Sequence, residues 1–284
     1  MVADPGVSWW ERYNDGVRRM HETGWGADAA VLSREICALL DDLDAAFAVT
    51  GAATPGWPNP YEDGTAPEEA EYERLTNPEK FLIVVARAQA WTRVLLDRGW
   101  AREASQVGWA LRPFEPGGAD AVLEPVADGA ALLVLTTHTP VDSEHIFTVT
   151  VAAGDPAVRL AEIPDCGCDA CDRGSAALLE ELDRWVLSVV DGSLEVEVTA
   201  DHSSIRTSFG AEGGTVRNLD RPTAFTAAPW PADWTARSIP PGIDTRHPEP
   251  GFPRTVLGIA ARTIRNRRLR RGGSPGSAQT YRST

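Results

Sequence analysis

The chain lacks the apolar runs that would place it in a membrane. No stretch of its 284 residues approaches the roughly 20 apolar residues that a spanning helix requires. The first residues, Met1 to Trp10, are acidic to neutral and contain no apolar core of a secretory signal. We therefore expect a cytoplasmic protein without a membrane span, in a compartment where thiols stay reduced.

Positive charge is also scarce. The chain holds 27 Lys and Arg against 41 Asp and Glu, a formal net charge of −14, and Lys80 is its only lysine. We attribute the preference for arginine to the codon bias of a GC-rich genome. Because a phosphate backbone is bound by clustered cations, the main body is not expected to bind nucleic acid.

Arginine is concentrated near the C-terminus, in a stretch without acidic residues. The 7 arginines there are Arg262, Arg265, Arg267, Arg268, Arg270, Arg271 and Arg282. Removing these 7 from the 27 leaves 20 basic against 41 acidic residues, so the preceding part carries a formal charge of −21. The arginine-rich tail either contacts an anionic surface of nucleic acid or lipid, or rests solvated on the acidic body. The second interpretation is favoured because the body would repel phosphate.

Known catalytic motifs are absent as well. The sequence contains no Gly-x-Ser-x-Gly elbow, no phosphate loop ending in Gly-Lys, no Gly-x-Gly-x-x-Gly and no His-Glu-x-x-His. A zinc deaminase is excluded because no His-x-Glu precedes Pro164, which is itself one residue too early for a Pro-Cys-x-x-Cys motif. The carboxylates of Asp41, Asp42 and Asp44 are expected on the outer face of a helix, where solvation explains them without a glycosidase role.

Apolar residues recur at helical spacing in the N-terminal part of the chain. One stripe runs from Trp9 to Met20 and another from Leu32 to Phe47, and the Pro- and Gly-rich stretch Gly51–Pro60 interrupts the pattern. Asn77-Pro78 predicts the start of a further helix that ends near Gly99.

From about Val107 the apolar period changes to two, which predicts β-strands. The expected strands are Val107–Phe114, Ala131–Thr137, His145–Val151 and Ala157–Ile163, followed by a closing hairpin of Leu194–Thr199 and Ile205–Phe209. Before the hairpin, a strongly amphipathic helix is expected, with Ser175 as its N-cap and Asp191-Gly192 as its stop.

These elements predict one α+β domain over residues 1–212. N-terminal helices pack on one face of an antiparallel sheet, and one further helix follows the cysteine loop. A Pro/Trp-rich extended segment, residues 213–253, is expected to wrap over this domain or link to it. Residues 254–284 are expected to form a basic helix and a disordered tail.

Three of the four cysteines, Cys166, Cys168 and Cys171, fall close together, whereas Cys37 is distant. In an extended Cys-x-Cys segment both side chains leave the same face, and a Cys-x-x-Cys turn suits tetrahedral zinc. In a reducing compartment such spacing favours a metal or redox role over a structural disulfide. We therefore expect a zinc site.

The strand order predicts which side chains meet these cysteines. In an up-down-up meander of the strands from Ala131 to Ile163, the hairpin tip lies at the sheet end that delivers the cysteine loop. The helix and strand that follow then bring the Asp201-His202 turn to that end. The fourth ligand is expected to be one of the histidines His138, His145 and His202, or an oxygen of Asp165, Asp169 or Asp172.

Two other interpretations of the cysteines stay open. A redox pair of Cys168 and Cys171 would lie before a helix N-terminus, whose dipole lowers a thiol pKa. The surrounding acids oppose that effect, and the βαβ context of thioredoxin-like proteins is absent. Alternatively, the thiols only pack and bind nothing. No second Cys-x-x-Cys and no His pair at finger spacing accompanies the cluster, so half of a recognisable zinc signature is missing.

Two stretches carry a family resemblance. They are Glu73–Phe81, which leads into Ala86–Trp91, and Ile163–Ser175, whose CGCDACDRGS motif precedes the amphipathic helix. Together they resemble an uncharacterised actinobacterial domain-of-unknown-function family. The resemblance covers roughly Val7 to Phe209 and implies a single recurring unit, without a known activity, fold or ligand.

Taken together, these patterns predict a non-enzymatic binding or interaction protein with a structural zinc held by Cys166, Cys168 and Cys171. The alternative is an enzyme, either a thiol-redox protein or a metal-dependent hydrolase that uses an open Cys/His site. The sequence identifies no substrate or partner.

Overall fold

The structure is a computed structural model that describes residues 7–24, 29–114, 118–140 and 145–240. Its helices and mostly antiparallel strands confirm the predicted α+β class. Residues 241–253 and the expected basic helix and tail at 254–284 lie outside the described residues.

Within the described residues, four α-helices match the predicted helical stripes. They are α1 (Trp9–Glu22), α2 (Arg34–Thr50), α3 (Leu82–Asp97) and α4 (Ser175–Val190), with short 3-10 turns η1 (Glu69–Tyr72), η2 (Pro78–Phe81) and η3 (Asp169–Cys171). Ser8 and Ser33 cap α1 and α2 by accepting bonds from the backbone N–H groups of Glu11 and Ile36.

Also within the described residues, six strands form the larger sheet, in the order β1-β3-β4-β5-β6-β2. They are β1 (Ala101–Ala104), β2 (Trp109–Leu111), β3 (Ala119–Pro125), β4 (Leu133–His138), β5 (Thr148–Ala153) and β6 (Ala157–Ile163). Neighbours are antiparallel, except that β2 pairs parallel with β6 at one edge. The expected meander of β4, β5 and β6 is confirmed, so the β4–β5 connection and the end of β6 share one end of the sheet.

The predicted closing hairpin is present, but it belongs to a second sheet. Here β7 (Leu194–Val198) and β8 (Ser203–Thr207) pair with two further strands, β9 (Gly210–Gly214) and β10 (Thr223–Thr226), in the order β10-β7-β8-β9. Strand β10 comes from the Pro/Trp-rich segment. Nearby, the Trp230 side chain is buried and its Nε1 donates to the carbonyl of Ala131 at 3.1 Å, so this segment packs on the domain as far as the structure describes it.

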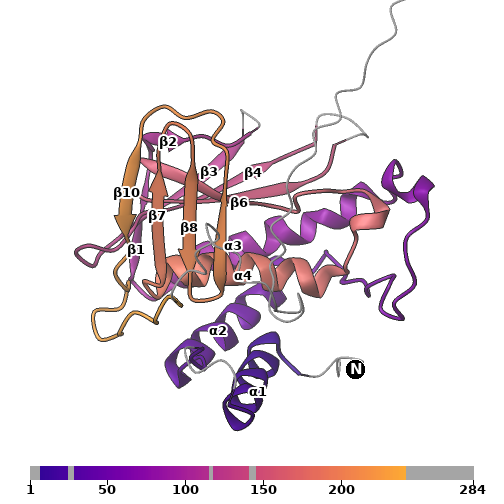
Figure 1. Cartoon of the computed structure of the whole chain (residues 1–284), viewed down its shortest axis with the longest axis horizontal. Coiled ribbons are helices and arrows are strands. Elements are labelled where there is room, and N and C mark those ends of the chain that lie inside the picture. Colours follow the sequence, from indigo (N-terminus) through magenta and orange to yellow (C-terminus); the bar gives the residue numbers. More distant parts are fainter. Residues whose placement is uncertain (1–6, 25–28, 115–117, 141–144, 241–284) are drawn as a thin grey trace, which may run out of the picture.

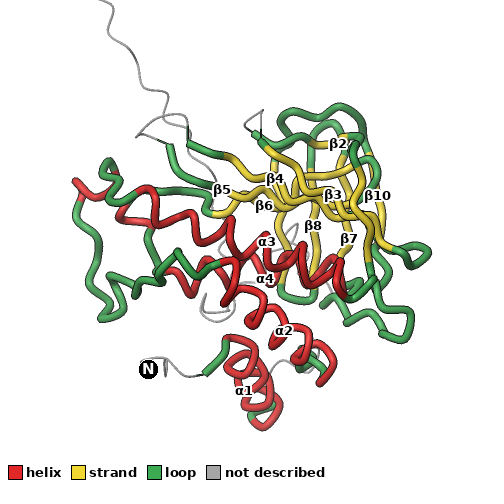
Figure 2. The backbone as a smooth tube through the Cα atoms, turned by 180° about the vertical axis from the view of Figure 1, so that it is seen from behind, coloured by secondary structure: helices red, strands yellow, loops and turns green. Residues whose placement is uncertain are grey.

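The elements are arranged in layers around one main core. Figures 1 and 2 show α3 and α4 beneath the larger sheet, α2 below them and α1 farthest from that sheet. Alternation along β4 explains the layering: Leu133 and Leu135 enter the main core with the helices, whereas Val134 joins a small cluster on the opposite face. Side chains of β7 and β8, such as Val196 and Ile205, enter the same main core.

A buried carboxylate joins the helices. Asp183 of α4, with an exposure of 0%, accepts bonds from Arg87 Nε and Nη2 of α3 at 2.9 and 2.7 Å. Trp9 Nε1 of α1 and Trp91 Nε1 of α3 each donate to it at 2.9 Å. Arg87 Nη1 also donates to Asp44 of α2 at 2.6 Å. We call these five residues the Asp183 cluster, and it includes a residue of every α-helix that the structure describes.

The carboxylates of the Asp183 cluster hold Arg87 in its charged form. Burial opposes the charge, but the two partners, Asp183 first, raise the pKa of the guanidinium above its ordinary value. For the Asp44 carboxyl, the effect of burial on the pKa exceeds that of its charged partner. Burial raises the pKa of this carboxyl above its ordinary value, although Arg87 partly offsets the effect.

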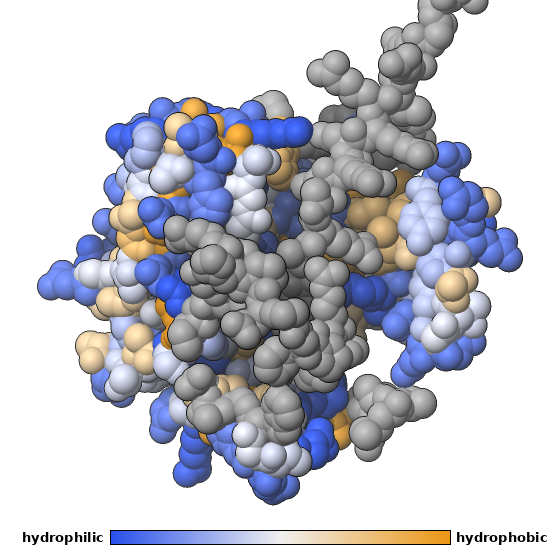
Figure 3. Space-filling model, viewed as in Figure 1, coloured by the Kyte–Doolittle hydropathy of each residue, from blue (hydrophilic) through white to orange (hydrophobic). Residues whose placement is uncertain are grey.

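One face of the described part of the molecule is mostly polar. On the face shown in Figure 3, the described residues are mostly hydrophilic, and hydrophobic side chains form small separate groups. Among the described residues, no helix combines the length and the apolar character needed to cross a membrane.

One local prediction is wrong. Helix α4 does begin at Ser175, but Ser175 is its first helical residue and Gly174 occupies the N-cap position. The Ser175 hydroxyl instead accepts a bond from the backbone N–H of Trp57 at 3.0 Å. A tertiary contact has therefore taken the side chain that local sequence assigned to a cap.

Replacing Asp183 tests the Asp183 cluster. Asp183→Asn should lower the free energy of unfolding by about 3–5 kcal/mol, because it leaves the Arg87 charge buried against a neutral amide. The matched control Asp44→Asn removes a partner whose side chain is 54% exposed and should cost less than about 1 kcal/mol. Urea unfolding followed by circular dichroism measures both, and equal losses would contradict the assignment.

Candidate metal centre

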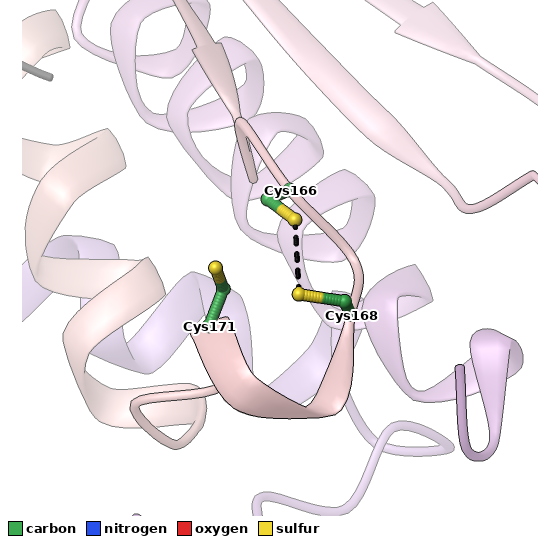
Figure 4. Close-up of side chains that lie close together, drawn as sticks. All are labelled: Cys166, Cys168 and Cys171. Atoms are coloured by element: carbon green, nitrogen blue, oxygen red, sulfur yellow. Dashed lines mark hydrogen bonds between the residues drawn. The ribbon is translucent and has the colours of Figure 1, made fainter. Parts of the chain in front are cut away.

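The three clustered cysteines turn their sulfur atoms toward one another. Cys166 and Cys168 follow the end of β6, and Cys171 ends the 3-10 turn η3. Their sulfur atoms all lie within 4.8 Å of one another, with the Sγ atoms of Cys166 and Cys168 at 3.3 Å. Figure 4 shows the three side chains converging from the two sides of the loop.

This geometry suits a metal better than a disulfide. Two thiolates on one tetrahedral zinc ion lie roughly 3.8 Å apart, given Zn–S bonds of about 2.3 Å. A disulfide would need about 2.05 Å between sulfur atoms, and none of the four cysteines is in a disulfide. Small side-chain adjustments would therefore bring the three sulfur atoms onto one ion.

The carboxylate of Asp169 fixes the cysteine loop to the segment before α3. It accepts bonds from Arg74 Nε at 2.6 Å, and from the backbone N–H and the hydroxyl of Thr76 at 2.8 and 2.7 Å. The backbone N–H of Asp169 donates in turn to the carbonyl of Arg74 at 2.8 Å. Burial raises the pKa of Asp169, but the bonds from Thr76 and Arg74 outweigh it, and the pKa lies below its ordinary value.

A second carboxylate, Asp172, fixes the other side of the loop. It accepts bonds from Lys80 Nζ at 2.6 Å, from Trp57 Nε1 at 2.9 Å and from the backbone N–H of Gly174 at 2.8 Å. Gly174 has φ +81°, and a Cβ there would lie 2.6 Å from the backbone nitrogen of Asn59, so only glycine fits. The Asp169 and Asp172 bonds join the two stretches that carry the family resemblance.

The environment of the thiols favours their protonated form. Burial raises the pKa of the Cys166 thiol. Burial, followed by hydrogen bonds with Cys166 and Cys171, raises the pKa of Cys168 to about 12. A reactive cysteine needs a lowered pKa, whereas a bound cation would stabilise thiolates and release their protons.

Two of the three histidines predicted to share a rim with the cysteines, His138 and His145, lie at the sheet end where the cysteine loop begins. His138 ends β4 and is buried, with its Nε2 3.3 Å from the Thr150 hydroxyl. His145 precedes β5, at the sheet end where the cysteine loop begins. His202 lies in the turn between β7 and β8, in the second sheet.

Among the described residues, the group of candidate ligand atoms contains the three sulfurs and none of the proposed fourth ligands. Those candidates are His138, His145, His202, Asp165, Asp169 and Asp172. The carboxylates of Asp169 and Asp172 already accept the bonds described above. The identity of the fourth ligand therefore stays a prediction.

A hollow of about 310 Å³ opens beside the cluster. Its walls come from three segments, within residues 72–75, 145–148 and 162–168. They include Cys166, Cys168 and His145, so the hollow reaches two of the three cysteines. Sequence reasoning did not find this hollow, because its walls come from segments far apart in the chain.

Acidic side chains crowd the side of the loop that faces β9. Burial, followed by the carboxylates of Glu181 and Asp165, raises the pKa of Glu212 from 4.5 to about 7. Burial also raises the pKa of Glu181, with Arg173 as the main opposing charge. The neutral form of Glu212 is thus favoured in the folded chain.

A comparison with family models finds a match to the sequence. The family model DUF6226, described as a family of unknown function, matches residues 43–240. No curated protein and no solved structure matches the chain. The match includes both stretches on which the resemblance was based and most of the Pro/Trp-rich segment, and it begins after α1.

The raised pKa of Glu212 predicts a pH-dependent stability. Because the folded pKa of about 7 exceeds the ordinary 4.5, the contribution of Glu212 is fully present below pH 4.5 and is lost as pH rises through 7. The free energy of unfolding of wild type should therefore fall between pH 5 and pH 8. In Glu212→Gln this fall should be smaller by on the order of 1 kcal/mol. Urea unfolding at both pH values measures this.

The same change at the exposed Glu124 of β3 is the control. It separates the effect of this site from a general reduction of negative charge. An identical pH dependence in wild type and Glu212→Gln would show that Glu212 does not contribute.

Proposed function

Since the chain belongs to DUF6226, a family of unknown function, we propose its function from its own residues: it is a non-enzymatic binding protein stabilised by a structural zinc. Cys166, Cys168 and Cys171 hold the ion. The observation that supports this most directly is the convergence of three sulfur atoms within 4.8 Å. A cytoplasmic location, where these thiols stay reduced, is part of the proposal.

The donor set favours zinc. Thiolates are soft ligands that select Zn²⁺, Cu⁺ or iron–sulfur clusters. Iron–sulfur clusters take four cysteines, whereas three thiolates plus one further donor form a common zinc site. Zinc also has no redox chemistry, which suits a structural role.

A structural role agrees with the position of the loop. The loop joins the end of β6 to the start of α4, and the bonds of Asp169 and Asp172 tie it to the segment that leads into α3. An ion bound by Cys166, Cys168 and Cys171 would cross-link the two sides of this loop. Because metal binds the folded site preferentially, its binding free energy adds to stability.

The enzymatic alternative has one favourable observation. The 3.3 Å separation of Cys166 Sγ and Cys168 Sγ would allow a thiol-redox pair after a small movement. The raised pKa values of both thiols oppose this, because a redox nucleophile reacts as the thiolate. A metal-dependent hydrolase would need the same ion with an open coordination position.

The distribution of charge bears on which partners the protein binds. The acidic body, which carries a formal charge of −21 once the 7 tail arginines are removed from the 27 basic residues and set against 41 acids, is proposed not to bind nucleic acid. For the arginine-rich tail, contact with an anionic surface stays the alternative to the favoured interpretation of a solvated tail beside the acidic body.

Metal analysis tests the structural zinc. The purified full chain should contain one zinc per molecule, and chelation should make three further thiols, Cys166, Cys168 and Cys171, available to a thiol reagent. Chelation should also lower the melting temperature. Cys166→Ser, Cys168→Ser and Cys171→Ser should each lower zinc occupancy, because a serine hydroxyl is a poor replacement for a thiolate.

Cys37→Ser is the matched control. Cys37 is a free thiol on α2, bonded to Asn14 and packed against the main core, and its replacement should leave zinc occupancy unchanged. A metal-free protein with one hyperreactive cysteine would overturn the proposal in favour of the redox enzyme.

Asp169 should support the site without touching the ion. Asp169→Ala removes the bonds to Arg74 and Thr76 and should weaken zinc binding about 10–100-fold, as loss of outer-shell partners does elsewhere. Competition with a chromophoric chelator measures this. Asp63→Ala, which removes a bond to the backbone of Thr65 in an exposed turn, should keep wild-type affinity. Equal affinity in both variants would show that Asp169 does not position the loop.

A further inference from the structure

The three-cysteine cluster has one side that opens to solvent. Cys166 and Cys168 line the hollow of about 310 Å³, whereas Cys171 is not part of its wall. A tetrahedral ion on three sulfur atoms has one position left. Among the described residues, no histidine, aspartate or glutamate places a ligand atom within the group.

We propose that this fourth position opens into the hollow and binds a small molecule through a neutral nitrogen donor of the imidazole class. The inference rests on the proposed metal site and extends it. The volume is at the lower end of the 300–1,000 Å³ typical of ligand pockets, which suits a substituted imidazole.

Charge selects the class of donor. Three thiolates on a divalent ion give the centre a formal charge of −1. The hollow adds the carboxylates of Glu73 and Asp165 against one guanidinium, that of Arg74. Arg74 is already bonded to Glu71 and Asp169, so little of its charge is available to an incoming anion. An anionic ligand would therefore be repelled, and a neutral donor would not.

Cobalt substitution gives a direct readout. Co²⁺ replaces zinc in the full chain under reducing conditions, and the visible spectrum reports both thiolate ligation and changes at the fourth position. Imidazole should change the spectrum saturably. Azide, a small anionic nitrogen donor that fits wherever imidazole does, should require a concentration about 10-fold higher or more. Cys37→Ser should respond as wild type does.

A double variant tests the role of charge. Glu73→Gln combined with Asp165→Asn removes two of the carboxylates that line the hollow and should narrow the difference between imidazole and azide. Glu124→Gln on β3 should leave that difference unchanged. An unchanged difference in the double variant would overturn the charge argument.

The possible failures are distinguishable. Cobalt that binds with a thiolate spectrum but ignores imidazole would overturn this inference and leave the metal site intact. The same holds if His145→Ala changes the cobalt spectrum without added ligand, because a protein imidazole would then fill the fourth position. Azide binding as tight as imidazole would overturn the choice of a neutral donor. No cobalt or zinc binding at all would overturn the proposed function and this inference together.

Discussion

The arrangement of the helices depends on one buried charge, the carboxylate of Asp183. A carboxylate at 0% exposure is tolerated only when hydrogen bonds replace its water, and Arg87, Trp9 and Trp91 supply four such bonds. These donors have defined directions, so α1 and α3 have few ways to meet α4. Apolar packing alone would accept several helix registers. The position of α4 in turn fixes where the preceding cysteine loop can lie.

Other carboxylates also join segments that are far apart in the sequence. Asp169 and Asp172 each join the loop to residues 57–80 of the chain, and buried Asp191 accepts a bond from Arg237 at 2.6 Å, which holds the C-terminal segment. In a chain with 41 acidic and 27 basic residues, carboxylates are abundant and cations are few. Carboxylates that pair with a distant cation or N–H donor therefore hold separate segments of the chain together.

Sequence periodicity predicted the elements whose apolar pattern is strong and missed those that are held by tertiary contacts. Strand Ala157–Ile163 was predicted with its observed bounds, and the meander correctly placed the β4–β5 connection and the cysteine loop at one sheet end. Strands β1, β3, β9 and β10 were missed because they are short or lie beside Gly and Pro. Lys80 was assigned no structural role and Asp44 was attributed to solvation, yet both form ion pairs across more than 40 residues, which no local period reveals.

Packing alone does not explain the cysteine cluster. A cysteine that only packs behaves as a small hydrophobe and is usually fully buried. All four cysteines are only half-buried, so burial does not separate them. They differ in what they contact: Cys37 packs against the main core, whereas the described residues that pack there include none of the other three cysteines. Cys166, Cys168 and Cys171 are partly exposed and point at one another. The carboxylates of Asp169 and Asp172 hold the loop in this arrangement, in which burial raises the pKa values of the Cys166 and Cys168 thiols. A bound cation would favour the thiolate forms where the three sulfur atoms converge.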